Sequence, residues 1–205
     1  MENLSTKEIT IGTLNAWLVN DKAVAEKIIQ NHWDINVDYS DWHNQIIENF
    51  IETADSLGFG IDFSDIQYTG FNSQGDGASF TCEIDLIGFL RGTKHLSHFK
   101  ALRRAIDNDI IADTVSVERG HSNYSHENTC YVNDIEVYSW EDDLTELQAS
   151  QLEGIQELLE EKRLELCSEL YSSLEKAYDE LTSRESIIST LCANEYEFTE
   201  LAEIA

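Results

Sequence analysis

A short cluster of turn residues separates two stretches that show the alternating pattern of β-strands. The second stretch, residues 78–86, places apolar side chains at every other position: Ala78, Phe80, Cys82, Ile84 and Leu86. The first stretch, residues 61–70, carries Ile61, Phe63, Ile66 and Tyr68. Because successive side chains of a strand point to opposite faces of a sheet, such alternation is typical of a strand with one buried face. The pattern therefore predicts a β-hairpin over residues 61–86.

The turn of this hairpin contains Gly75, Asp76 and Gly77. Glycine adopts positive φ without a steric penalty, and aspartate tolerates it better than most residues. Turn chemistry alone explains these residue types, so we favour a tight connection. The alternative is a ligand loop, in which backbone N–H groups and the Asp76 carboxylate face a bound molecule.

A second loop lies between the strands expected at residues 113–119 and 129–138. It contains His121, Tyr124 and His126, with Cys130 just after it. Two histidines and a cysteine can bind zinc, but loop histidines are more often hydrogen-bonded structural groups, and no fourth ligand is evident. We therefore expect no metal and no cofactor. The candidate ligand loop as a whole comprises Ser73, Gln74, Gly75, Asp76, Gly77, His121, Tyr124 and His126.

The remaining patterns predict an α+β fold. Helical periodicity indicates helices near residues 21–32, 41–57 and 95–111, and a long helix that ends near Leu181. A short helix and a short final strand follow it. Asn20 or Asp21 is the expected cap of the first helix, Ser40 is the expected cap of the second, and Gly58 is the expected stop of the second. We expect a mainly antiparallel sheet of four or five strands with helices packed on one face. The predicted domains are an α+β core over residues 1–140 and an acidic helical C-terminal region over residues 141–205.

The charge of the chain constrains its partners. The 205 residues include 40 acidic and 13 basic ones, for a net charge of −27. Such a field repels nucleic acid and anionic membranes and favours basic partners, including proteins that themselves bind nucleic acid. Solubility alone is the alternative explanation. Five basic residues are concentrated in one segment, where we favour internal charge compensation over a nucleotide or phosphate site: Arg91, Lys94, Lys100, Arg103 and Arg104.

Much of the negative charge falls on the long helix and beyond, since residues 141–205 contain 18 acidic and four basic residues. Five glutamates recur at every fourth position: Glu153, Glu157, Glu161, Glu165 and Glu169. On a helix each such step rises about 6 Å, so the row winds along one side. A solvated helix face is the commonest explanation of such a row, but a solvated face usually mixes both signs of charge. A row of one sign can therefore imitate a phosphate backbone and bind a basic protein.

The opposite side of this helix carries an apolar stripe that includes Leu159, Leu166, Leu170 and Leu174, with Lys162 and Arg163 interrupting it. The stripe can pack on the protein's own sheet or pair with a second copy of the chain. A homodimer is therefore expected if one layer does not cover it.

The hairpin also carries a resemblance to known proteins. The pattern Tyr68-x-Gly70-Phe71-x-Ser73-Gln74-Gly75-Asp76-Gly77-Ala78-x-Phe80 resembles a motif of small, mostly uncharacterised proteins of tailed bacteriophages. The resemblance extends over about residues 30–140, through Asp34-Ile35-Asn36-Val37-Asp38 and Gly120-His121-Ser122-Asn123-Tyr124-Ser125-His126. It implies a phage origin and the cytoplasm of an infected bacterium. It implies no catalytic role for any residue.

Two hypotheses for function follow. The first is an acidic interaction protein that inhibits a host nucleic-acid-binding defence component by DNA-like charge mimicry. The alternative is a nucleotide- or metal-binding protein, or an enzyme, that uses the Gly-Asp-Gly turn and the His121/His126 loop. Phosphate-loop, dinucleotide, G-x-S-x-G and H-E-x-x-H motifs are absent from the sequence, so we favour the first hypothesis and expect no enzymatic activity. Widely spaced cysteines and an N-terminus without a basic and apolar leader fit a reduced, cytoplasmic setting.

Overall fold

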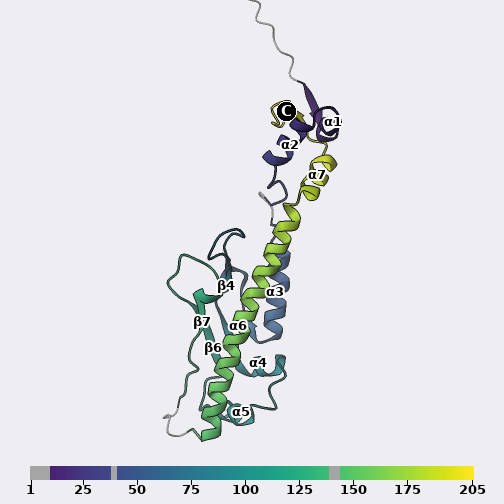
Figure 1. Ribbon diagram of the computed structural model, residues 1–205. Helices are drawn as coiled ribbons and strands as arrows, with labels where there is room; N and C mark the ends of the chain where they lie inside the picture. The colour runs from purple at the N-terminus through teal and green to yellow at the C-terminus, as the bar shows by residue number, and fades with distance from the viewer. Residues whose placement is uncertain (1–9, 38–40, 139–143) are drawn as a thin grey trace, which may run out of the picture. The chain divides into compact units, whose positions relative to one another are not determined.

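A computed structural model describes residues 10–37, 41–138 and 144–205 and confirms the α+β fold with antiparallel sheets (Figure 1). The chain forms two compact units. The larger extends from His43 to Glu175, and the smaller combines the residues up to Trp42 with those from Lys176 onward. The predicted boundary at residue 140 does not separate these units, because the long helix contributes to the core of the first one.

The larger unit is built on a four-stranded antiparallel sheet with the strand order β2-β5-β6-β7. Its strands are β2 (Phe59–Gly60), β5 (Cys82–Asp85), β6 (Thr114–Arg119) and β7 (Cys130–Val132). Ile84 in β5 lies opposite Phe59 on one side and Val115 on the other, and all three are buried. The apolar alternation of β5 and β6 thus forms one buried face of the sheet.

The predicted hairpin forms as a separate two-stranded sheet of β3 (Ile66–Tyr68) and β4 (Ala78–Phe80). Ile66 pairs with Phe80, and Tyr68 pairs with Ala78. It is shorter than predicted at both ends. Residues Phe63–Asp65 form a 3₁₀ helix, η1, and the alternating stretch 78–86 splits into β4 and β5, which belong to different sheets.

The helices of this unit are α3 (Asn44–Ser56), α4 (Leu86–Gly92), α5 (Lys100–Asp107) and α6 (Glu146–Leu181), which continues into the smaller unit. The sequence pattern did not predict α4. It begins at once after β5 because the Asp85 carboxylate accepts a hydrogen bond from Ile87 N at 3.0 Å, which caps its first turn. Ser40, the expected cap of α3, lies outside the described residues.

The core of the larger unit contains a chain of aromatic contacts. Phe59 packs edge-to-face against Phe80 and Phe89, with ring centroids 6.1 and 6.0 Å apart. The predicted stop of α3 at Gly58 is confirmed, with φ of +83°. A side chain there would meet the Phe89 backbone nitrogen at 2.6 Å, so this approach of α3 to α4 needs glycine.

Helix α6 runs past β7 in Figure 1, and its side chains bond to that strand and the segment that follows it. Gln156 donates to the carbonyl of Asn133 at 2.9 Å, and Glu160 accepts from Val132 N at 3.3 Å. The apolar stripe of α6 is buried within the single chain, with Leu159, Leu166 and Leu170 at most 1% exposed. The stripe on which the expected homodimer depended is therefore covered by the chain itself.

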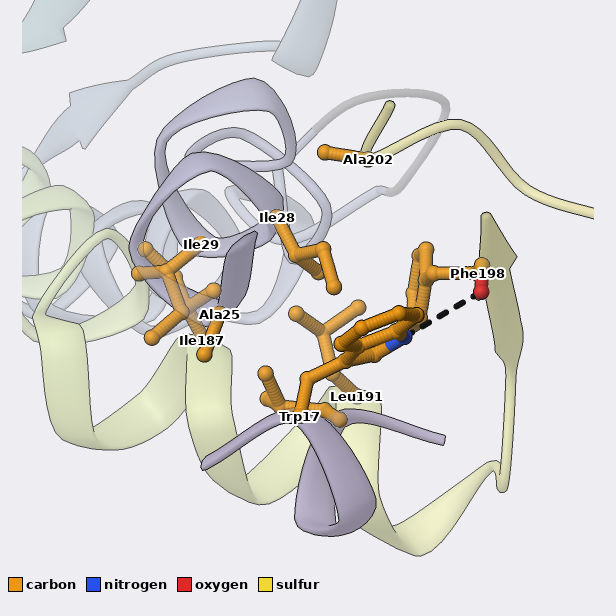
Figure 2. Close-up of a cluster of buried hydrophobic side chains, with 9 residues drawn as sticks. Trp17, Ala25, Ile28, Ile29, Ile187, Leu191, Phe198 and Ala202 are labelled. Carbon is orange, nitrogen blue, oxygen red and sulfur yellow. Dashed lines mark hydrogen bonds between the residues drawn. The ribbon is translucent and has the colours of Figure 1, made fainter. Parts of the chain in front are cut away.

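The smaller unit joins the two ends of the described chain. It contains α1 (Leu14–Asn20), α2 (Lys22–Asn31), α7 (Arg184–Ala193) and a two-stranded antiparallel sheet of β1 (Ile11–Thr13) and β8 (Glu197–Thr199). The indole of Trp17 donates to the carbonyl of Phe198 at 3.1 Å, inside a cluster that includes Ile28 and Leu191 (Figure 2). Of the two expected caps of α2, Asn20 and Asp21, the structure shows Asp21, whose carboxylate accepts from Ala23 N and Val24 N.

Within the described residues, no helix combines the length and the apolar character that crossing a membrane demands.

Candidate functional site

The two loops that could form a ligand site lie against each other in the larger unit. A Cβ atom added to Gly75 would lie 3.3 Å from the ring of Tyr124, and one added to Gly77 would lie 2.4 Å from Cβ of His126. Gly75 has a φ of +93°. Gly77 is needed for a different reason, since its backbone touches the opposite loop directly.

The polar groups at the centre of these loops bond within the loops. The Asp76 carboxylate accepts from Asn72 N at 2.9 Å and from Ser73 N at 2.5 Å, which closes the turn. The His126 ring accepts from Asn128 N at 3.2 Å and caps a 3₁₀ helix, η2 (Glu127–Thr129). These contacts support the structural interpretation of Asp76 and His126.

The other candidates of the ligand loop are distributed over an open surface. Ser73, Gln74, His121 and Tyr124 are exposed. Among residues 10–37, 41–138 and 144–205, no three His, Cys, Asp or Glu side chains lie close enough to hold a metal ion. The loops thus meet as the sequence suggested, but through packing and turn closure.

The aromatic residues of the motif attach the hairpin to α6. Phe71 stacks between Tyr68 and Tyr171, with ring centroids 6.2 and 5.7 Å away and an interplanar angle of 27° in both pairs. The Tyr171 hydroxyl donates to the carbonyl of Gly70 at 3.2 Å. Most of the motif's distinctive residues therefore shape and anchor one turn.

The glutamate row lies on the surface of α6. All five of its members are exposed, and Glu165 forms an ion pair with Lys162. The side of α6 that carries Ile155, Leu159 and Leu166 is buried. The expectation that the row lies opposite the apolar stripe is confirmed, and the row is open to contact with another molecule.

A buried polar cluster that the sequence patterns did not predict lies between α6 and β7. Arg163 is only 2% exposed. Its guanidinium donates to the Glu160 carboxylate, to the Glu127 carbonyl and, at 3.2 Å, to the sulfur of Cys130. The Cys130 and Cys167 sulfurs lie 3.9 Å apart.

The sequence did carry a signal for this cluster. Arg163 stands four residues after Leu159 and three before Leu166, which is a stripe position rather than an interruption. Glu160 lies three residues earlier, within reach of an ion pair along the helix. A cation on a buried stripe with a carboxylate one turn away predicts a buried pair, whereas the adjacent Lys162 points to the exposed side.

Residues 42–184, more than half of the chain, match the model of one protein family, described as a domain of unknown function (DUF8835). No curated protein and no solved structure matches the chain. Neither these comparisons nor the contacts of the described residues point to an enzymatic activity.

Proposed function

The chain belongs to the DUF8835 family, and we propose that it acts as an acidic interaction protein whose α6 glutamate row binds a basic protein. The observation that carries the proposal is the exposure of Glu153, Glu157, Glu161, Glu165 and Glu169 along one side of α6. From the first to the last of these residues the helix rises about 24 Å.

The energetics of the row favour a function in binding over one in folding. Like charges four residues apart cost an isolated helix about 0.2–0.5 kcal/mol per pair. The opposite side of α6 supplies the buried contacts, so folding does not require the glutamates. The row thus costs helix stability without contributing to the core, and a function in binding would account for a cost of this kind.

The class of partner follows from the charge. A groove that neutralises DNA phosphates with Lys and Arg side chains also attracts a regular row of carboxylates. We infer that the partner is a nucleic-acid-binding protein and that the chain competes with its nucleic acid. The resemblance to tailed-phage proteins would place that partner in a host cell, as a component of a defence system. The proposal includes no direct contact between this chain and nucleic acid or a membrane.

The row is not uniform, and this determines the design of the test. Glu161 and Glu165 border a hollow of about 430 Å³ that is also lined by Lys94, His95 and Lys162. Glu153, Glu157 and Glu169 are absent from its lining, and no ion pair within 4.0 Å joins them to another described residue. A variant with Gln at these three positions therefore probes the row without changing the mixed-charge hollow.

The test is competition for a captured partner. The tagged chain retains proteins from a host lysate, and a retained basic protein is then purified and measured against the parent and the E153Q/E157Q/E169Q variant. The matched control is E48Q/E52Q/E118Q, which removes three exposed carboxylates elsewhere in the same unit.

We expect the row variant to bind the partner at least tenfold more weakly than the parent does at low salt. The affinity of the variant should also depend less on salt concentration. The variant should displace less DNA from the partner than the parent does. The control should stay within about threefold of the parent, because a distant rim charge acts mainly on the encounter rate. If the row variant binds the partner as tightly as the control variant at both low and high salt, the glutamate row does not form the binding site.

A further inference from the structure

A groove in the larger unit gathers basic side chains on a protein whose net charge is −27. It has a volume of about 590 Å³ and lies over the end of α4, the loop that follows and one side of α5. Its lining consists of Arg91, Lys94, Leu96, Ser97, Lys100, Arg103, Arg104 and Asp107. Five of the 13 basic residues of the chain therefore face one hollow, with a single carboxylate among them.

Direct ion pairs supply little of the internal charge compensation that the sequence led us to expect there. Arg103 pairs with Asp107 at 3.6 Å, and both side chains are more than half exposed. Among the described residues, Arg91, Lys94, Lys100 and Arg104 form no ion pair within 4.0 Å. A direct ion pair therefore compensates only Arg103 among the five residues, while Arg91 and Lys94 also border hollows that contain carboxylates. An anion that entered the groove would lower the repulsion among the cations that no ion pair neutralises.

The backbone around the groove is held in place from α6. The Gln151 side chain donates to the carbonyl of His98 at 2.7 Å and accepts from Ala101 N and Leu102 N at 3.0 and 2.9 Å. On the other side, His95 N donates to the Leu90 carbonyl at 2.8 Å and closes the end of α4. The elements that carry the cations are thus fixed before any ligand arrives, which lowers the entropy cost of binding.

Carboxylates limit the length of ligand that fits. Arg91 also borders a hollow that contains Asp55, Glu83 and Asp85. Lys94 also borders the hollow that contains Glu161 and Glu165. A long polyanion that followed the cations would meet these carboxylates, whereas a compact one beside Lys100, Arg103 and Arg104 would not. The volume of the groove also falls in the range of small-molecule sites.

From these observations we propose that the groove binds the oligophosphate group of a small molecule. Guanidinium groups bind phosphate oxygens through paired charge-assisted hydrogen bonds, and lysines add point charges. The site is separate from the proposed partner-binding row, and its test does not depend on that proposal. An inorganic oligophosphate and a nucleoside triphosphate share this chemistry, and the experiment separates them.

The experiment measures binding of tripolyphosphate, ATP and a short single-stranded DNA to the full chain by titration calorimetry, in chelator and low salt. The K100Q/R104Q variant removes two unpaired cations of the groove. The matched control K22Q/K27Q removes two exposed lysines of α2, in the smaller unit. The D107N variant removes the one carboxylate of the lining and frees Arg103.

We expect tripolyphosphate to bind the parent. Its affinity should fall at least tenfold in K100Q/R104Q and change less than twofold in K22Q/K27Q. Its affinity should rise in D107N. All the substituted side chains are exposed, so the variants should keep the parent's melting temperature within a few degrees. Equal binding of ATP would identify the phosphate tail as the shared determinant, and weaker binding of ATP would favour the inorganic anion.

Three results would overturn the proposal. They are no binding of tripolyphosphate at millimolar concentration, equal weakening by the groove and control variants, or binding of ATP or single-stranded DNA without tripolyphosphate.

Discussion

The guanidinium of Arg163 lies 3.2 Å from the sulfur of Cys130, and both residues are buried. A hydrogen bond from Cys167 and the positive charge of Arg163 together lower the pKa of Cys130 to about 6. Burial has the opposite effect on Cys82, whose pKa is raised to about 12. The same chain thus holds two thiols whose pKa values are displaced in opposite directions.

We predict a thiolate that forms near pH 6 in the folded protein. The change in absorbance at 240 nm between pH 4.5 and 8 should show this step, and C130S should abolish it. R163M and C167S should each move the midpoint toward higher pH, because each removes one cause of the lowered pKa. If the folded parent shows no thiolate below pH 8, the Arg163–Cys130 contact does not stabilise the ionised form.

The same ionisation predicts how stability depends on pH. The lowered pKa of Cys130 lies below the value of an unfolded thiol, about 8.5. Between the two values the unfolded chain binds more protons than the folded one, so this contribution to stability rises with pH. It should be fully present above about pH 8.5 and be lost as the pH falls through about 6. Urea unfolding of the parent and C130S at pH 5.5 and 8.5 measures the difference, which should be larger at pH 8.5.

Two glutamates of α6 make ion pairs of the same i,i+3 spacing, in opposite order along the helix and in different surroundings, and their substitutions should differ. Glu160 pairs with Arg163, whose side chain is 2% exposed, whereas Glu165 pairs with Lys162, which is 27% exposed. E160Q leaves a buried charge short of its partner and should cost about 3 kcal/mol of unfolding free energy. E165Q should cost less than about 1 kcal/mol. Urea unfolding of both variants tests this, and equal losses would contradict the burial of Arg163.

The turn of the motif should tolerate a methyl group at one glycine and reject it at another. An added Cβ at Gly77 would lie 2.4 Å from His126 Cβ and 2.7 Å from His126 Cα, so G77A should cost about 2 kcal/mol or more. At Gly70 the nearest atom would be an Asp76 oxygen at 3.7 Å. G70A should therefore be neutral or slightly stabilising. Thermal unfolding of the two variants measures this difference in stability, and a neutral G77A would mean that the loops are not in contact.

The glutamate row should destabilise α6 through its own charge. E157Q removes repulsion from both Glu153 and Glu161 and should raise the free energy of unfolding by a few tenths of a kcal/mol. Because the effect is electrostatic, it should shrink in 1 M NaCl. E165Q is the matched comparison, since it also loses the ion pair with Lys162. A destabilising E157Q at low salt would indicate that Glu157 has a structural partner.

Local patterns predicted local features well. The cap of α2 at one of two neighbouring residues, the Gly58 stop, the β3–β4 hairpin and the end of α6 at Leu181 all follow from residues within a few positions of one another. Patterns could not show that the alternating stretch 78–86 divides between two sheets. That division depends on pairing with Phe59 and Val115, which are distant in sequence.

The sequence predicted which residues form the candidate sites but not which of their charges are paired. The sequence showed the exposed glutamates, the two loops and the basic segment. The Arg103–Asp107 pair is local, since the two residues lie four positions apart along α5, and the sequence could predict it. Whether a carboxylate from another element reaches Arg104 depends on tertiary distances, which the sequence does not show. The buried position of Arg163 could be inferred from the stripe, but its contact with Cys130 could not, because 33 residues separate them.

The contacts of the smaller unit determine the order in which the two units can fold during translation. Trp17 bonds to a carbonyl 181 residues further along the chain. At 5–20 residues per second, roughly 10–40 s of translation separate the two partners. Throughout that interval the side chains of Leu14, Trp17 and Ile28 lack the residues of the cluster that later cover them. The larger unit needs only residues up to Glu175, so it can fold first. The nascent N-terminal segment must stay soluble, or be held by a chaperone, until Leu191 and Phe198 emerge.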